Sequence, residues 1–205
     1  MTDTGPDADP DPDPEAGTLA DVPQAWPVAG STDLHRDGWV VALRADIVET
    51  PDGGQARRVV MEHPGAAVVL AVDDERQVVV LRQYRHPAGR RFVELPAGLL
   101  DGDPGEEPLD VARRELREEA GLEATDWTHL ASTWPSPGIS AEVQHLFLAR
   151  GLREVDRDFE PEHEEADMEL VRVPLDALRD AVLEGRVSDG PLVQCVLLAG
   201  ARGLL

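Results

Sequence analysis

The stretch ARRELREEAGL, residues 112–122, concentrates negative charge on a short segment of the chain. Glu115 and Glu119 are four positions apart, and Glu118 is three positions from Glu115. Residues at these spacings are neighbours on the surface of an α-helix, so the three carboxylates project to one side. Arg114 lies four positions before Glu118 and can hold its carboxylate in place. The stretch therefore predicts a helix that carries a carboxylate cluster.

The ends of this helix are marked by residues that favour helix termini. Pro108 suits the first turn, and Gly121 can adopt the left-handed conformation that ends a helix. Apolar residues recur at spacings of three and four and predict a face that packs on a sheet: Leu109, Ala112, Leu116 and Ala120. Taken alone, the helix allows two interpretations: a solvated acidic face with arginine counter-charges, or a carboxylate site for a hard divalent cation such as Mg²⁺.

The composition excludes several classes of partner. The chain has 205 residues, of which 41 are acidic and 19 basic, and its formal net charge is -22. Nucleic acids and anionic membranes require a basic face, so we expect neither as a partner. Cys195 is the only cysteine, which excludes an intrachain disulfide and is typical of a reducing compartment. There is no apolar leader and no membrane-length apolar run, so we expect a cytoplasmic protein.

The pattern along the chain predicts a tail and one domain. Residues 1–32 are rich in Asp and Pro, and we expect them to form an acidic, disordered tail. Residues 33–205 then form the domain, in which residues 33–64 are N-terminal strands. Apolar runs predict strands at 38–50, 57–63, 65–72, 76–86, 90–100, 128–134, 142–152 and 170–174, with further helices at 175–185 and 190–203. A hairpin is expected around residues 73–75. The order of elements favours a mixed α+β or layered α/β/α domain.

A wider pattern surrounds the glutamate helix. Gly98 is followed by a seven-residue spacer, then Glu106, then seven residues, then the run from Arg114 to Leu122. This resembles the box of the Nudix hydrolases, which reads Gly, spacer, Glu, seven residues, Arg-Glu-aliphatic-any-Glu-Glu-any-Gly-aliphatic. Every defined position from Glu106 to Leu122 matches. The spacer departs from the usual five residues, and the two extra residues fall in the turn-rich loop DGDPG, which tolerates insertion.

The resemblance implies a fold and a metal site. The fold is an α/β/α sandwich with a mixed sheet, here with an N-terminal antiparallel strand extension. Glu115 and Glu119 are implied as direct ligands of Mg²⁺ or Mn²⁺, with Glu118 nearby through water and the carbonyl of Ala97 as a backbone ligand. Glu106 and Arg114 are implied as supports that fix the loop and orient a carboxylate, and metal sites need such outer partners.

Three features outside the box resemble the bacterial ADP-ribose pyrophosphatase branch of the family. Pro137 lies sixteen residues after Gly121, at an offset typical of that branch. The stretch LRQYRH precedes ELPAGLLD, and Arg85 in it could contact a phosphate or the terminal ribose; a surface strand end is the competing interpretation. The acidic loop PEHEEADM resembles the loop that carries the catalytic base, so Glu164 or Glu165 would deprotonate the water or complete a metal site; a solvated acidic loop is the competing interpretation.

The resemblance also implies an assembly and a reaction. The branch forms homodimers that exchange N-terminal strands, so Arg57 or Glu94 could reach a substrate. The implied reaction is Mg²⁺-dependent hydrolysis of ADP-ribose, a small nucleoside diphosphate sugar, to AMP and ribose 5-phosphate. The alternatives are a pyrophosphatase for another nucleotide sugar and a non-catalytic ADP-ribose sensor. The intact glutamates Glu115, Glu118 and Glu119 weigh against the sensor.

Overall fold

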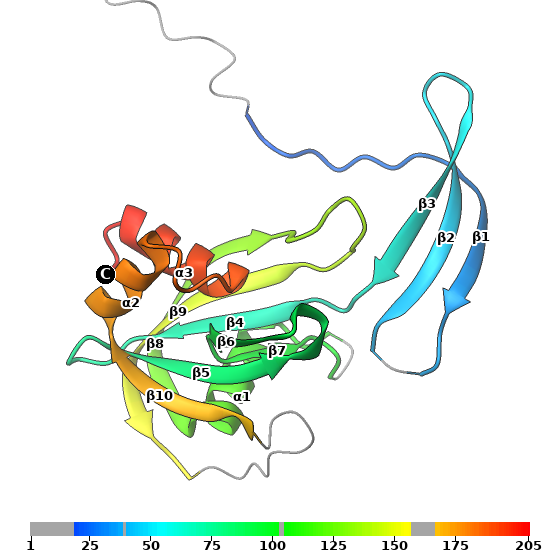
Figure 1. Ribbon diagram of the computed structural model, residues 1–205. Coiled ribbons are helices and arrows are strands. Elements are labelled where there is room, and N and C mark those ends of the chain that lie inside the picture. The colour runs from blue at the N-terminus through cyan, green and yellow to red at the C-terminus, as the bar shows by residue number, and fades with distance from the viewer. Residues whose placement is uncertain (1–18, 39, 103–104, 157–166) are drawn as a thin grey trace, which may run out of the picture.

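A computed structural model describes residues 19–38, 40–102, 105–156 and 167–205 (Figure 1). The greater part of the predicted tail, Trp39, and both candidate bases, Glu164 and Glu165, lie outside the described residues. No helix within the described ranges is long and apolar enough to cross a membrane.

Two sheets form the body of the molecule. The first has the order β7-β4-β9-β8, and the second has the order β10-β5-β6. Their strands are β4 (Ala66–Ala71), β5 (Gln77–Arg85), β6 (Arg90–Glu94), β7 (Ala97–Leu99), β8 (Leu122–Thr133), β9 (Gln144–Glu154) and β10 (Glu169–Pro174). β4 runs parallel to β9 and antiparallel to β7, so the first sheet is mixed, as the resemblance implied.

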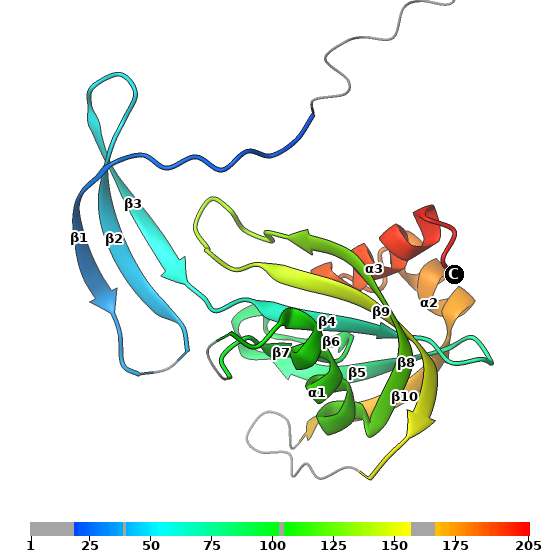
Figure 2. The same ribbon diagram turned by 180° about the vertical axis from the view of Figure 1, so that it is seen from behind.

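Helices cover both faces of the body, which forms an α/β/α sandwich (Figures 1 and 2). The helices are α1 (Pro108–Ala120), α2 (Leu175–Leu183) and α3 (Gly190–Ala201), with a short 3₁₀ turn at His86–Ala88. Strand β4 is buried on both sides, because its side chains alternate between two cores. Ala67 and Val69 pack with α1, whereas Val68 and Leu70 pack with α2 and α3. The predicted fold class is confirmed.

The hairpin expected around residues 73–75 is only partly correct. The chain does turn there, but β4 and β5 belong to different sheets and share a single bridge, Val72 to Val78. The edges of β4 are occupied by β9 and β7, so β5 pairs with β10 and β6 instead. Local alternation identifies both strands but carries no information about which distant strand takes each edge.

A third sheet, of order β1-β2-β3, projects from the body (Figure 1). Its strands are β1 (Val28–His35), β2 (Ala42–Glu49) and β3 (Gln55–Glu62), and we call it the N-terminal sheet. Strand β1 was not predicted, and the expected boundary between residues 32 and 33 falls inside it. Strand β1 is exposed along its whole length and is held by pairing with β2, so it lacks the burial pattern that reveals a strand in sequence.

The N-terminal sheet joins the body at the end of β3. The Met61 amide donates to the Ile139 carbonyl over 2.7 Å, and the Ala141 amide donates to the Met61 carbonyl over 3.0 Å. The end of β3 is therefore hydrogen-bonded to the loop between β8 and β9. The chain continues from there through His63 into the body.

Candidate active site

Helix α1 places its carboxylates at the edge of the core. Val111, Ala112 and Leu116 are fully buried against the mixed sheet, and this packing fixes the rotation of the helix. Glu115 and Glu119 lie beside this apolar face and are only 8% and 9% exposed. The predicted helix is confirmed at both ends: Pro108 is in its first turn, and Gly121 ends it with a left-handed φ of 63°.

Gly98 allows α1 to approach strand β7. A Cβ atom built at Gly98 would lie 2.0 Å from the carboxyl carbon of Glu115, closer than real Cβ contacts allow. A larger residue at this position would force the Glu115 carboxylate to move away from the strand. The absence of a side chain at Gly98 thus allows the described position of a glutamate seventeen residues later.

The carboxylates are held by specific partners. Arg114 Nη1 donates to Glu115 Oε1 over 2.6 Å and to Glu118 Oε2 over 3.5 Å. Arg114 Nε also lies 3.7 Å from Glu106 Oε1, so this arginine links the first glutamate of the box to the helix. The Ala97 amide donates to Glu119 Oε2 over 2.8 Å, which brings the predicted backbone ligand next to the predicted carboxylate ligand.

Burial acts against the negative charge of Glu115. Desolvation raises the pKa of the Glu115 carboxyl to about 7, while Arg114 opposes this rise and Glu118 adds to it. A half-buried arginine is thus insufficient to restore the ordinary carboxylate pKa. A bound cation close to the same oxygens would lower this pKa.

The carboxylates open into a cleft of about 680 Å³ between α1 and the N-terminal end of α3. Glu115, Glu118, Glu119 and Asp101 line it on the side of α1 and the preceding loop. The opposite walls are formed by Arg85, Gln83, Glu94, Asp189, Glu142 and Gln144. Among the described residues, the lining of the cleft therefore has many hydrogen-bond acceptors and a single arginine.

That arginine is fixed by the neighbouring strand. Arg85 Nη2 donates to Glu94 Oε2 over 2.7 Å, and Arg85 Nε lies 3.0 and 3.2 Å from the two carboxylate oxygens. Glu94 raises the pKa of Arg85, and more distant Glu119 and Asp189 act in the same direction against desolvation. Arg85 and Glu94, which were predicted separately as substrate contacts, thus form an ion pair with each other.

Two other predicted substrate contacts lie outside the cleft of this chain. Arg57 is on β3 of the N-terminal sheet, where it is exposed and pairs in register with Ile47 of β2. Pro137 is exposed in the loop between β8 and β9, whose turn is closed by the amides of Ile139 and Ser140 donating to the Ser136 carbonyl. Their contact with a substrate stays a prediction.

Several residues of the cleft were missed in the sequence. Asp189 begins α3, and its side chain accepts a hydrogen bond from the Leu192 amide over 3.0 Å. An Asp two residues before Pro191 is a recognisable helix cap, but this signal does not indicate a cleft. Glu142 and Gln144 lie at the start of β9, and no local pattern distinguishes them from other polar residues at a strand end.

The donor set fits a hard divalent cation. The α1 side of the cleft offers only oxygen ligands, and Mg²⁺ and Mn²⁺ prefer such ligands. In the conformation described, however, no three carboxylate, imidazole or thiolate groups of the described ranges converge as a complete metal site. Glu115 and Glu119 instead accept from Arg114 and from the Ala97 amide, so the chemistry fits while the coordinating geometry is not formed.

Comparisons with known proteins agree with the fold and the box. Residues 61–194 match the family model described as NUDIX domain. An ADP-ribose pyrophosphatase of Mycobacterium tuberculosis is 45% identical over 83% of this chain and 79% of its own length. An ADP-ribose pyrophosphatase of Bacillus subtilis is 41% identical over 69% of this chain and 76% of its own.

A solved structure described as an ADP compounds hydrolase has a TM-score of 0.71 at 21% identity, and the match covers 91% of this chain and all of that one. This likeness supports the fold. The domain match and the identity to the relatives show that the chain belongs to the Nudix family.

Proposed function

We propose that the protein hydrolyses ADP-ribose to AMP and ribose 5-phosphate with Mg²⁺ or Mn²⁺. The observation that carries this proposal is that Glu115, Glu118 and Glu119 line one cleft together with Arg85. Carboxylates for a cation and an arginine for a phosphate are the two requirements of a diphosphate site. The names of the relatives from M. tuberculosis and B. subtilis support ADP-ribose as the substrate.

Each residue of the box has a proposed part in this reaction. Glu115 and Glu119, with the carbonyl of Ala97, would bind the cation, and Glu118 would do so through water. Arg114 holds Glu115 and Glu118 in place through its guanidinium. A bound cation would lower the pKa of the attacking water and neutralise charge on the leaving phosphate.

Arg85 is proposed to orient the diphosphate. Glu94 engages Nε and Nη2 of its guanidinium, so Nη1 can donate to a phosphate oxygen without breaking that ion pair. The proton acceptor is proposed to be Glu164 or Glu165, both of which lie outside the described residues.

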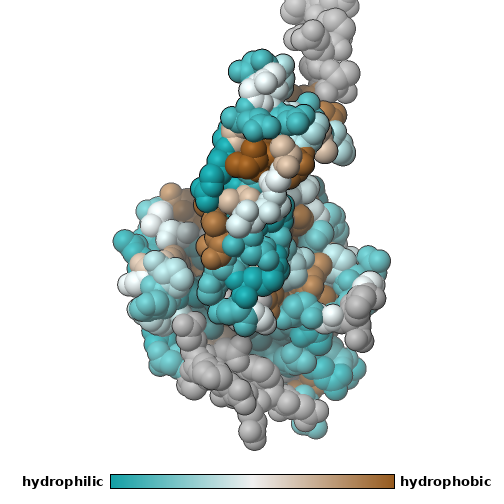
Figure 3. All heavy atoms as spheres, turned by 90° about the vertical axis from the view of Figure 1, so that its right-hand side faces the viewer, coloured by the Kyte–Doolittle hydropathy of each residue, from teal (hydrophilic) through white to brown (hydrophobic). Residues whose placement is uncertain are grey.

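We further propose a homodimer built through the N-terminal sheet, in a cytoplasmic enzyme. Leu43 pairs with Met61 and Ala45 with Val59, and side chains paired in this way share one face, so the part of that face nearest the body is apolar, while Arg57 lies further along it. Figure 3 shows hydrophobic side chains among the hydrophilic ones on the side of the molecule where this sheet projects. In such a dimer, Arg57 could reach the partner's cleft.

The dimer is tested by sedimentation. We expect the wild type to sediment as a dimer and Val59→Asp, which places a charge on the apolar face, to sediment as a monomer. The matched variant Val60→Asp lies on the opposite face beside Arg44 and should remain dimeric. A monomeric wild type would contradict the proposal.

The reaction is tested by product analysis of the purified protein with Mg²⁺ or Mn²⁺. The panel contains ADP-ribose, ADP-glucose and GDP-mannose. We expect ADP-ribose to have the highest kcat/KM. GDP-mannose is the second candidate, since relatives from Yersinia enterocolitica and Citrobacter koseri named GDP-mannose pyrophosphatase are 29% and 31% identical. Binding of ADP-ribose without cleavage would favour the sensor.

A further inference from the structure

Gln144 occupies a central place in the wall of the cleft. It is the first residue of β9 and pairs with Ala66 of β4 on one side and Thr133 of β8 on the other. Its side chain lines the cleft, yet the residue is only 9% exposed. A polar side chain at this depth is expected to have all its hydrogen bonds satisfied.

One end of the Gln144 amide has a partner and the other does not. Nε2 donates to Glu142 Oε1 over 2.8 Å, and this bond fixes the orientation of the amide, because the reverse orientation would set two acceptors against each other. The carbonyl oxygen, Oε1, is buried without a hydrogen-bond partner. Among the described residues it is the only buried side-chain nitrogen or oxygen in this condition.

An unpaired buried acceptor is destabilising, and an apolar side chain of similar size would avoid it. Gln144 therefore carries an unpaired acceptor that lowers the stability of the fold, and it does so in the wall of the cleft. Strain of this kind in a cleft wall is consistent with a ligand that completes the missing bond.

The chemistry of the missing partner follows from the acceptor. Oε1 can only accept a hydrogen bond, so it cannot bind a phosphate oxygen that is itself an acceptor. The neighbouring Glu142 is an acceptor as well. In ADP-ribose the groups that can donate are the ribose hydroxyls and the exocyclic amine of adenine. The hydroxyls lie nearer to the diphosphate that the carboxylates of this cleft are proposed to hold, so they are the better candidates.

We propose that Gln144 is a specificity-determining residue that accepts a hydrogen bond from a sugar hydroxyl of the substrate. The inference rests on the proposed function, because it assigns a contact to the same cleft. Oε1 is covered in the conformation described, so meeting the hydroxyl requires the amide to turn about its terminal torsion and to give up the bond from Nε2 to Glu142. That torsion has broad, shallow preferences, and the bond from the hydroxyl replaces the one that is lost.

Gln144→Met tests the assignment, with Gln194→Met as the matched control. Gln194 is half-buried on α3, and its Oε1 already accepts from Thr133 Oγ1 over 2.9 Å outside the cleft. For Gln144→Met we expect kcat/KM for ADP-ribose to fall roughly tenfold, through KM, while the melting temperature is unchanged or higher. For Gln194→Met we expect a lower melting temperature and unchanged kinetics, because a structural hydrogen bond is lost.

Two analogues distinguish the sugar at either end of the diphosphate. Adenosine diphosphate β-methyl ester lacks the distal ribose, and the 2′,3′-dideoxyadenosine form of ADP-ribose lacks the hydroxyls of the nucleoside ribose. We expect the effect of Gln144→Met to disappear with one of them, which identifies the hydroxyl. An equal fall with ADP-ribose and both analogues would overturn the proposal.

Two further outcomes would also overturn it. A melting temperature lowered by Gln144→Met with unchanged kinetics would mean that Oε1 binds a structural water. Failure of Gln144→Met to fold would show the same structural role. A wild type that cleaves none of the three compounds would instead refute the proposed function.

Discussion

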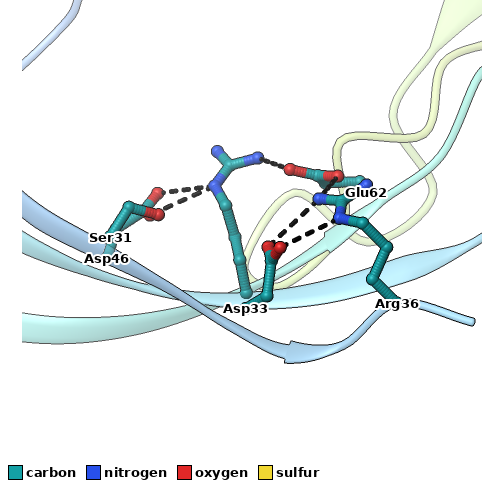
Figure 4. Close-up of polar contacts among 6 residues, drawn as sticks. Ser31, Asp33, Arg36, Asp46 and Glu62 are labelled. Carbon is teal, nitrogen blue, oxygen red and sulfur yellow. Dashed lines mark hydrogen bonds and ion pairs between the residues drawn. The ribbon is translucent and has the colours of Figure 1, made fainter.

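Carboxylates in the N-terminal sheet and in the cleft have opposite electrostatic surroundings. In the sheet, Ser31 and Arg44 lower the pKa of Asp46, and Arg44 and Arg36 lower the pKa of Glu62. Figure 4 shows these contacts as one continuous network on a single face, with Arg44 Nη1 2.5 Å from Glu62 Oε1.

The cleft contains carboxylates whose pKa is raised. Burial raises the pKa of Glu115 to about 7 and that of Asp189 to about 6. Arginines are present in both regions, but for Glu115 and Asp189 desolvation outweighs the attraction of Arg114 and Arg85, respectively. The arginines of the sheet therefore favour the charged form of its carboxylates, whereas burial in the cleft disfavours the charged form of Glu115 and Asp189, and the proposed cation would favour it again.

The largest difference between the regions should appear in catalysis. Glu119→Gln keeps the side-chain size and an acceptor for the Ala97 amide but removes a carboxylate ligand. We expect kcat to fall on the order of 10³-fold, because a bound cation supplies several kcal/mol of charge stabilisation. Steady-state kinetics at saturating Mg²⁺ measure this, with circular dichroism to verify the fold. Near-normal turnover would remove Glu119 from the ligand set.

Stability should also separate the two regions. Leu70 of β4 has no exposed surface, so Leu70→Ala should lower the free energy of unfolding by about 2–5 kcal/mol. Leu34 of β1 is 48% exposed, and Leu34→Ala should change the free energy of unfolding by less than about 0.5 kcal/mol. Denaturant unfolding measures both variants. A large effect of Leu34→Ala would show that β1 is covered in solution.

The sequence predicted what depends on local spacing. The helix from Pro108 to Ala120, the side to which its glutamates project and the contact of Arg114 with Glu118 all follow from a 3.6-residue period. The turn around residues 73–75 was also predicted from a local pattern. The pairing of its two strands was predicted wrongly, because the edges of β4 are taken by β7 and β9, which lie far away in the sequence.

The part of the site that was missed depends on tertiary contacts. The approach of Glu115 to Gly98 requires a helix packed on a strand, and nothing near Gly98 in the sequence indicates it. Asp189 and Gln144 reach the cleft because α3 and β9 both begin at its rim. Strand β1 was not predicted for a related reason, since within the part of the chain that the structure describes it pairs with strand β2 alone.

The pH dependence of stability should sharpen the contrast. The folded-state pKa of Asp189 lies above its ordinary value of 3.8, so the folded protein holds an extra proton between about pH 4 and pH 6. Ionisation of Asp189 therefore lowers stability as the pH rises through this window, and the loss is complete above the folded pKa.

Asp189→Asn isolates that effect. Asparagine cannot ionise, and it still accepts from the Leu192 amide as a helix cap. Above pH 6 we expect the variant to be more stable than the wild type by at most about 3 kcal/mol, with the difference vanishing near pH 4. Denaturant unfolding of metal-free protein at several pH values measures the difference. If the difference in the free energy of unfolding between the variant and the wild type did not depend on pH, the ionisation of Asp189 would not be its cause.

A small effect is also expected from the ion-pair network of the N-terminal sheet. Arg44→Met removes the contacts to Asp46 and Glu62, but buried Asp46 keeps its hydrogen bond from Ser31 and partly exposed Glu62 keeps its contact with Arg36, so we expect a small loss. Amide hydrogen exchange in β1–β3 should accelerate roughly two- to fivefold, with β4 and β9 unchanged.

Arg113→Met provides the control, because Arg113 forms an ion pair with Asp110 on the surface of the body.

Low pH supplies an independent test of the network. The pKa values of Asp46 and Glu62 are lowered in the folded protein, so their ionised forms stabilise the sheet at neutral pH. This contribution is lost as the pH falls below about 4.5. Exchange in the N-terminal sheet of the wild type should then accelerate, and Arg44→Met should show less of this change. An equal acid response in both proteins would mean that backbone pairing alone, and not the network, holds the sheet together.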